Sequence, residues 1–334
     1  GNRSKAPENK RWAAGRAGSG HGIERTSAAE CFECEVVDAV GAVERLQGVV
    51  RRDAARASGR REDYEAIITE QRLLPPLDHP DPARWLITGT GLSHLGSAAA
   101  RDAMHVKIQQ ADDALTDSMR MFKWGIEGGK PADGAIGTPP EWFYKGDGRW
   151  VVPPGAPLEL PAFAADGGEE VELAGLYVIA DDGTPCRVGF ALANEYSDHV
   201  TERLNYLYLA HSKLRQSSYG PELLTGPLPA SVKGTARLLR DGAVVWSGDW
   251  LSGEDNMCHS IANLEHHHFR YRQFRTPGDV HVHYFGAATG SFTQKVETRP
   301  GDVFEIAAEG FGRPLRNALG PAVEPLRHVA VRTL

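Results

Sequence analysis

The glutamates Glu170 and Glu172 stand two positions apart at the start of a long apolar run, in the stretch GEEVELAGLYVI at residues 168–179. In a β-strand, alternate side chains point to the same face, so the two carboxylates would lie about 7 Å apart along the strand and aim at one point. Carboxylates in that arrangement can bind a hard cation, which takes oxygen ligands. The alternative is an edge strand whose acidic face is solvated.

A third carboxylate, Glu195, follows the next apolar stretch. The turn sequence DDGT at 181–184 separates the first strand from CRVGFALAN at 186–194, which ends just before Glu195. If the two strands form a hairpin, Glu195 returns to the neighbourhood of the first pair. Because Mg²⁺ usually keeps open positions for water and substrate, three convergent carboxylates suit it. The sequence therefore predicts a metal site formed by Glu170, Glu172 and Glu195, with Mg²⁺ as the ion and Mn²⁺ or Ca²⁺ as substitutes.

Most of the chain has the pattern of short strands that would position these residues. The turn sequences DDGT, RDGA and RPGD separate several of them. Two long helices are expected, at 96–123 and 256–273, besides a short helical stretch that begins at Tyr64 and stops before Pro75. Few helices among many strands predict a mainly β domain with a rolled or barrel-like sheet. The expected strands cover residues 85–88, 150–152, 170–179, 186–193, 231–240, 243–249, 280–285 and 302–308.

The beginning of the chain differs from the rest. Residues 1–61 are rich in Arg, Ala and Gly, and their one sustained apolar pattern, around residues 36–50, would suit a helix. Such a composition favours loose order. We therefore expect an atypical N-terminal segment over residues 1–62, which contributes little to the core, and a catalytic domain over residues 63–334.

The overall composition favours a globular protein that acts on small molecules. Of the 334 residues, 41% are apolar, which is enough for a sizeable core. The formal charge is −7 and the pI is near 6.0, so the chain has no overall cationic field for nucleic acid. No apolar run reaches the roughly 20 residues of a membrane span, and the start lacks a signal-peptide pattern. We expect a cytoplasmic protein without nucleic-acid or membrane partners.

Six stretches, taken in order, resemble the fumarylacetoacetate hydrolase superfamily. They are similar to its glycine-rich segment, metal-binding strand, third-ligand segment, lysine loop, closing helix and final strand. The stretches are ITGTGLSH (87–94), EVELAGLYVI (170–179), GFALANEYSDH (189–199), AHSKLRQSSYGPEL (211–224), NMCHSIANLEHH (256–267) and PGDVFEIAAEGFGRPLRN (300–317). The resemblance covers residues 73–319. It implies a rolled β catalytic domain, a divalent metal on the three carboxylates, a 2-oxo acid substrate and a homodimer.

Three departures from the family pattern bear on function. Glu195 stands where aspartate is usual, which keeps the charge of the ligand but adds a methylene. In the hydrolases a glutamate closely follows the histidine and orients it, whereas His94 is followed by LGSAAARD. Residues 1–61 do not resemble the small strand-rich subdomain with which the family opens.

The resemblance implies that the metal stabilises an enolate of the substrate. In a hydrolase, a water activated by histidine attacks the C4 carbonyl and the C–C bond breaks as the enolate leaves; in a dehydratase, the C3 proton is removed and the 4-hydroxyl is expelled. Because a water-activating histidine needs a partner that fixes its tautomer, the missing glutamate favours dehydration. Residues 89–105 and 259–269 also resemble a bacterial subfamily of sugar-acid and pentose breakdown. That likeness implies a lyase that converts a 2-keto-3-deoxy-pentonate to α-ketoglutarate semialdehyde.

Four further residues take roles from the resemblance. Lys213 lies where the family has a lysine facing the substrate, and it would neutralise the substrate carboxylate or act as the base. Tyr206 matches a substrate-contacting tyrosine, and Lys145, in WFYKG, is a second candidate for binding the substrate carboxylate. His94 is the other catalytic candidate. Each residue has a plainer interpretation as a surface or packing residue.

Two other functions stay open on the sequence alone. One is hydrolysis of an acylpyruvate C–C bond, or decarboxylation of an oxaloacetate-like acid, at the same metal site. The other is a binding protein without catalysis, suggested by the irregular N-terminus and by Glu195. The histidines at 266–268, with His281 and His283, do not predict a zinc site, because adjacent helical side chains diverge by about 100°. We expect these histidines to pack or to face solvent.

Overall fold

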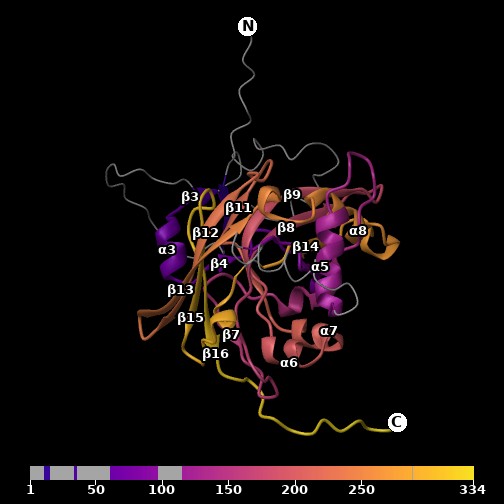
Figure 1. The fold of residues 1–334 in the computed structure, drawn as a ribbon. Helices are drawn as coiled ribbons and strands as arrows, with labels where there is room; N and C mark the ends of the chain where they lie inside the picture. The colour runs from indigo at the N-terminus through magenta and orange to yellow at the C-terminus, as the bar shows by residue number, and fades with distance from the viewer. Residues whose placement is uncertain (1–10, 16–33, 36–60, 97–114, 288) are drawn as a thin grey trace.

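The computed structural model describes residues 11–15, 34–35, 61–96, 115–287 and 289–334 (Figure 1). Strands dominate this part of the chain, and they form a large sheet and a small one, with a separate two-stranded pairing of β2 (Cys34–Glu35) and β3 (Arg61–Glu62). The large sheet curls into a half-barrel. The predicted mainly β architecture is therefore confirmed.

The large sheet carries the strands that matter for the site. Its order is β4-β1-β11-β9-β8-β14-β5-β6, and β10 also pairs with β9. All residues of the central strand β8 are buried, which explains its continuous apolar sequence. The strands are β1 (Arg11–Gly15), β4 (Leu73–Leu74), β5 (Trp85–Gly91), β6 (Glu141–Asp147), β8 (Val171–Ile179), β9 (Pro185–Asn194), β10 (Ser218–Tyr219), β11 (Glu222–Leu224) and β14 (Val280–Tyr284).

The small sheet packs against the large one across the main hydrophobic core. Leu173 and Phe190 from the large sheet meet Leu238 and Phe304 from the small sheet in one buried cluster. The small sheet has the order β13-β12-β15-β16-β7. Its strands are β7 (Leu158–Glu159), β12 (Val232–Arg240), β13 (Ala243–Ser252), β15 (Val303–Ala308) and β16 (Leu315–Gly320).

The helices are short and lie around the sheets. In Figure 1 the small sheet lies on the left, α5 and α8 on the right, and α6 and α7 below. The α-helices are α3 (Tyr64–Thr69), α5 (Asp117–Gly128), α6 (His199–Leu204), α7 (Leu209–Lys213) and α8 (Ile261–Phe269). Single 3₁₀ turns are η1 (Pro82–Arg84), η3 (Gly148–Trp150), η4 (Tyr206–Tyr208), η5 (Glu254–Asn256), η6 (Arg272–Phe274) and η7 (Ser291–Gln294). None of the helices in the described part of the chain has the length and hydropathy that a membrane span needs.

Local capping explains where the predicted elements were wrong. Residues 150–152 do not form a strand, because the Asp147 side chain accepts from the Arg149 N–H and caps the 3₁₀ turn η3. The helix expected at 256–273 is shorter, since the Ser260 hydroxyl caps it and α8 begins at Ile261. The helix expected at 96–123 is seen as α5, and residues 97–114 lie outside the described residues.

The described piece of the N-terminal segment joins the large sheet. Residues of β1 pair antiparallel with β11 on one side and with β4 on the other. The helix expected around residues 36–50 lies outside the described residues. Residues 11–15 are thus integrated into the sheet of the predicted catalytic domain.

Candidate metal centre

The hairpin of β8 and β9 brings three glutamates together. Glu172 lies in β8, Glu170 directly precedes that strand, and Glu195 directly follows β9. Antiparallel pairing aligns Glu172 with Ala193, and the Glu195 N–H donates to the Glu170 carbonyl at 3.1 Å. One carboxylate oxygen from each glutamate lies within 4.8 Å of the others. The structure therefore shows the convergence that the ExE spacing and the DDGT turn predict.

Glu172 and Glu195 are buried, Glu170 is partly exposed, and the charges of the three carboxylates repel one another. Glu172 and Glu195 are 1% and 0% exposed. Burial, followed by the charges of Glu195 and Glu170, raises the pKa of Glu172 well above its usual value. Burial and the Glu170 charge raise the pKa of Glu195 to about 8. Burial alone would raise the pKa of Glu170, but Lys213 and His199 hold it well below its usual range. A divalent cation would relieve this repulsion, so the donor set fits Mg²⁺.

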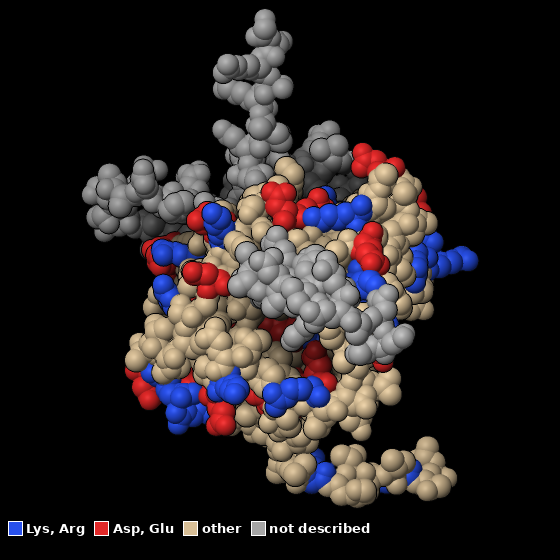
Figure 2. All heavy atoms as spheres, in the orientation of Figure 1, with Lys and Arg blue, Asp and Glu red and all other residues tan. Residues whose placement is uncertain are grey.

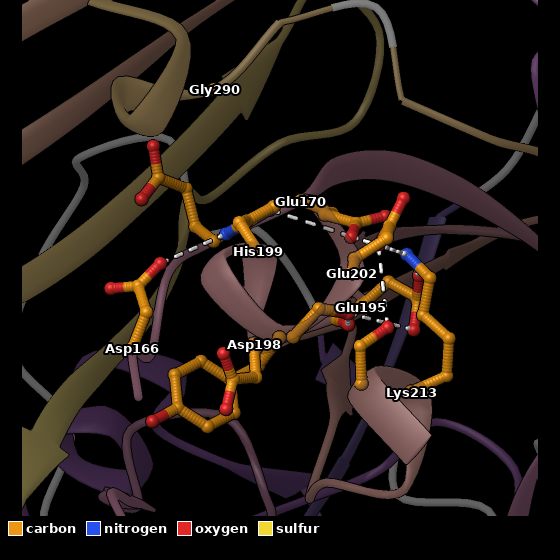
Figure 3. Close-up of polar contacts among 12 residues, drawn as sticks. Asp166, Glu170, Glu195, Asp198, His199, Glu202, Lys213 and Gly290 are labelled. Carbon is orange, nitrogen blue, oxygen red and sulfur yellow. Dashed lines mark hydrogen bonds and ion pairs between the residues drawn. The ribbon is translucent and has the colours of Figure 1, made fainter. Parts of the chain in front are cut away.

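Lys213, at the end of α7, places its ammonium against the centre (Figure 3). Its Nζ contacts Glu170, lies 3.0 Å from Glu195 Oε2 and lies 3.4 Å from Glu202 Oε2. Burial would lower the pKa of Lys213, but the surrounding carboxylates raise it well above its usual value. Lys213 is therefore held as a cation beside the acidic cluster, as the predicted substrate-facing lysine would be.

Lys145, on β6, is fully surrounded by protein acceptors. Its Nζ lies 2.7 Å from Glu195 Oε1 and donates to the carbonyls of Tyr196 at 2.7 Å and Lys213 at 3.0 Å. Burial lowers its pKa, an effect that Glu195 partly offsets. These contacts let Lys145 orient Glu195 and the chain around α7, whereas binding a substrate carboxylate would require it to leave them.

Glu141 is a site residue that the sequence analysis missed. It lies on β6 with its side chain 8% exposed, and the Tyr206 hydroxyl is its hydrogen-bond partner. Burial raises the pKa of Glu141 to about 7, a shift that Lys213 opposes. The carboxyl fits because residue 91 is glycine, and a Cβ there would overlap Glu141 Oε1. The sequence did contain a signal, because the spacing between Glu141 and Lys145 places both side chains on one face of a strand.

His94 is held by two serines, and it is not a member of the three-carboxylate group. Its Nε2 lies 2.8 Å from Ser252 Oγ and its Nδ1 3.0 Å from Ser93 Oγ. Burial alone lowers its pKa to about 4, so the imidazole is neutral at pH 7. The structure thus gives His94 hydroxyl partners in place of the carboxylate that a water-activating histidine needs.

The histidines near α8 pack inside the protein, as predicted, except for the exposed His266. His268 Nε2 lies 3.0 Å from His281 Nδ1, and His283 Nδ1 lies 2.8 Å from Thr88 Oγ1. His267 contacts the Gly137 carbonyl at 2.9 Å. Among the described residues, the three glutamates are the one group of three or more potential metal ligands close enough to share an ion.

Solved structures share this fold. No protein-family model and no curated protein matches the chain. The apo form of 2-keto-3-deoxy-D-arabinonate dehydratase is similar over 86% of this chain and 89% of its own, with a TM-score of 0.61 and 19% identity. The same dehydratase complexed with magnesium and 2,5-dioxopentanoate gives a TM-score of 0.60 over the same shares, also at 19% identity. A 5-carboxymethyl-2-hydroxymuconate delta-isomerase from Mycobacterium smegmatis gives 0.51 at 18% identity, over 79% of this chain and 84% of its own. The chain therefore has a fold of the fumarylacetoacetate hydrolase type.

Proposed function

We propose that this chain is a metal-dependent lyase of the fumarylacetoacetate hydrolase superfamily, which dehydrates a 2-keto-3-deoxy sugar acid. The main support for this proposal is the convergence of Glu170, Glu172 and Glu195 on the β8–β9 hairpin. It is supported by the fold shared with a dehydratase that was solved with magnesium and 2,5-dioxopentanoate. That compound is α-ketoglutarate semialdehyde, the product that the sequence resemblance implies for a pentonate substrate.

Different residues of the protein would have different roles in such a reaction. Bound to Glu170, Glu172 and Glu195, Mg²⁺ would supply Lewis-acid stabilisation of negative charge on the substrate's 2-oxo oxygen. Lys213 presents a cation at the same place, suited to the substrate carboxylate. Lys145 keeps Glu195 in position from the side of β6.

Dehydration also requires a proton to leave C3 and another to reach the departing 4-hydroxyl, so that water is released. A group that exchanges protons near neutral pH serves this best. Glu141, with a pKa of about 7 and Tyr206 as its hydrogen-bond partner, has that property. Because the pKa of Lys213 is raised, Lys213 suits charge neutralisation better than proton removal. We therefore assign the proton transfers to Glu141 and the binding of charge to Lys213.

The hydrolase alternative receives less support from the site. Its water would need a histidine oriented by a carboxylate, and both ring nitrogens of His94 face serine hydroxyls. A binding protein without catalysis is the third possibility. It would give no turnover, and it would gain no thermal stability from Mg²⁺ if it lacked the metal site as well.

The test is product analysis with the purified chain. A panel of 2-keto-3-deoxy-pentonates and acylpyruvates would be incubated with Mg²⁺ and, separately, with a chelator. We expect one organic product, lighter than the sugar acid by one water, formed only when metal is present. Glu172→Gln should abolish this turnover, whereas the matched change at an exposed site, Glu309→Gln, should preserve it. Two organic products from an acylpyruvate would establish hydrolysis in place of dehydration.

A further inference from the structure

His199 lies between a carboxylate of the metal centre and a second carboxylate outside it. It is the first residue of α6, four positions after Glu195. Its Nε2 lies 3.4 Å from Glu170 Oε1, and its Nδ1 lies 3.5 Å from Asp166 Oδ2 (Figure 3). The line Asp166–His199–Glu170 thus enters the three-glutamate group from one side.

The pose of the His199 ring is fixed by its surroundings. The ring stacks on Phe292, with centroids 4.8 Å apart and planes 17° from parallel. Phe292 belongs to η7, which is anchored where Glu169 accepts from the N–H of Ser291 at 2.6 Å and from its hydroxyl at 2.9 Å. A Cβ on Gly168 would come within 2.8 Å of the imidazole, so the glycine before Glu169 leaves the space that the ring fills.

Each glutamate of the centre has its own anchoring partner. Glu172 accepts from the Gly286 N–H at 2.8 Å, and Glu195 is held by Lys145 at 2.7 Å. Glu170 is the most exposed of the three, with a side chain 12% exposed. Lys213 contacts both Glu170 and Glu195, so its contact is not specific to Glu170. Among the described residues, His199 is an imidazole contact of Glu170 that neither Glu172 nor Glu195 has.

We propose that Asp166 and His199 form a positioning pair, in which Asp166 orients the imidazole and the imidazole holds Glu170 in its ligating orientation. Partners of this kind fix metal ligands in many proteins, and their loss lowers metal affinity about 10–100-fold. The inference rests on the proposed metal centre but not on the reaction. It predicts that Asp166, which is not one of the three ligands, still influences the ion.

The test measures Mn²⁺ affinity by electron paramagnetic resonance of the free ion, without substrate. His199→Phe keeps a flat ring for stacking on Phe292 but removes both ring nitrogens, and Asp166→Asn removes only the charge of the outer contact. We expect His199→Phe to weaken Mn²⁺ binding about 10–100-fold and Asp166→Asn to weaken it several-fold. Asp166→Asn should add almost nothing to His199→Phe, since both act through one ring. The control is Asp241→Asn in the exposed β12–β13 turn, which should bind Mn²⁺ like the wild type.

Unchanged affinity in His199→Phe, or a full additional loss from Asp166→Asn in that background, would overturn the pair while leaving the metal centre intact. If His199→Phe has a lowered thermal midpoint, Asp166→Asn alone decides, and unchanged affinity there overturns the inference. A wild type that binds no Mn²⁺ would overturn the pair and the centre together. Absence of dehydration with normal Mn²⁺ binding would count against the proposed reaction only.

Discussion

Four glutamates define the proposed site: Glu170, Glu172 and Glu195 as the metal ligands and Glu141 as the group that transfers protons. Glu170 and Glu172 were predictable because strand alternation fixes their common direction, and Glu195 because a short turn returns the chain. The raised pKa of Glu141 could not be predicted from its spacing to Lys145. This pKa depends on burial against Gly91 and beside Tyr206, and these contacts join distant parts of the sequence.

The proton-transfer role of Glu141 predicts a specific pH dependence. Its raised pKa means that it changes protonation near pH 7, where an unperturbed glutamate is already ionised. The kcat/KM profile of the wild type should therefore have an inflection near pH 7. Glu141→Gln should lose that inflection and about 10²–10⁴-fold in rate. An unaltered profile in the variant would remove Glu141 from the mechanism.

The relative importance of His94 and Lys213 separates dehydration from hydrolysis. His94 faces two serines, whereas Lys213 faces the carboxylates of the centre. His94→Ala should therefore retain measurable activity, and Lys213→Ala, which removes the cation that would neutralise the substrate carboxylate, should lose about 10²–10³-fold in kcat/KM. Steady-state kinetics on both variants, with thermal unfolding to confirm that each folds, gives the comparison. The reverse order would favour the hydrolase.

Among the elements, the hairpins could be predicted from patterns within one segment of the sequence. Contacts between distant segments could not. The β8–β9 and β12–β13 hairpins follow from apolar runs separated by turn residues. The strand β6 was missed because its EWFYKGD sequence mixes charged and aromatic residues. Its charged residues are buried through partners elsewhere in the chain, such as Glu195 for Lys145, and these partners cannot be read from the local pattern.

The histidines of β14 are buried, and His281 contacts His268 of α8. We therefore expect the protein to lose stability in acid. Burial lowers the pKa of His281 to about 4, and burial together with the His281 charge lowers that of His283 to about 3. The unfolded chain takes up these protons near pH 6.5 while the folded chain does not, so stability present above pH 6.5 is lost as the pH falls toward 4. Each histidine accounts for about 1–2 kcal/mol between pH 7 and pH 5.

Chemical denaturation at pH 7 and pH 5 measures this effect. We expect His281→Asn to lose less free energy of unfolding between the two pH values than the wild type does. The exposed His328→Asn should behave like the wild type. Equal pH dependence in all three proteins would show that the buried histidines do not control acid stability.

At the scale of the whole molecule, the fold was predictable as a class and its N-terminal connection was not. Many short strands with few helices indicated a rolled β domain. Nothing in the RWAAG sequence of β1 indicated that it pairs between β4 and β11, because a short strand is specified by its neighbours. On the face drawn in Figure 2, the blue and red residues are interspersed, which suits a small-molecule substrate better than a polyanion.

The position of β1 predicts the effect of truncation. Removing residues 1–15 would expose one edge each of β4 and β11, since both lose β1 as a partner and β11 keeps only β9. We expect this deletion to give a thermal midpoint several degrees below that of a protein that lacks only residues 1–10 and so keeps β1. Differential scanning calorimetry of the two truncated proteins makes the comparison. Equal midpoints would mean that β1 contributes little to the sheet.

The proposed function depends on Glu170, Glu172 and Glu195 holding one divalent ion. A crystal of the wild type soaked in Mn²⁺ would test it most directly, through the anomalous signal of the metal. We predict one strong peak about 2–2.5 Å from an oxygen of each glutamate. No peak among the three carboxylates, or a strong peak only at other residues, would show that these glutamates do not form the metal site.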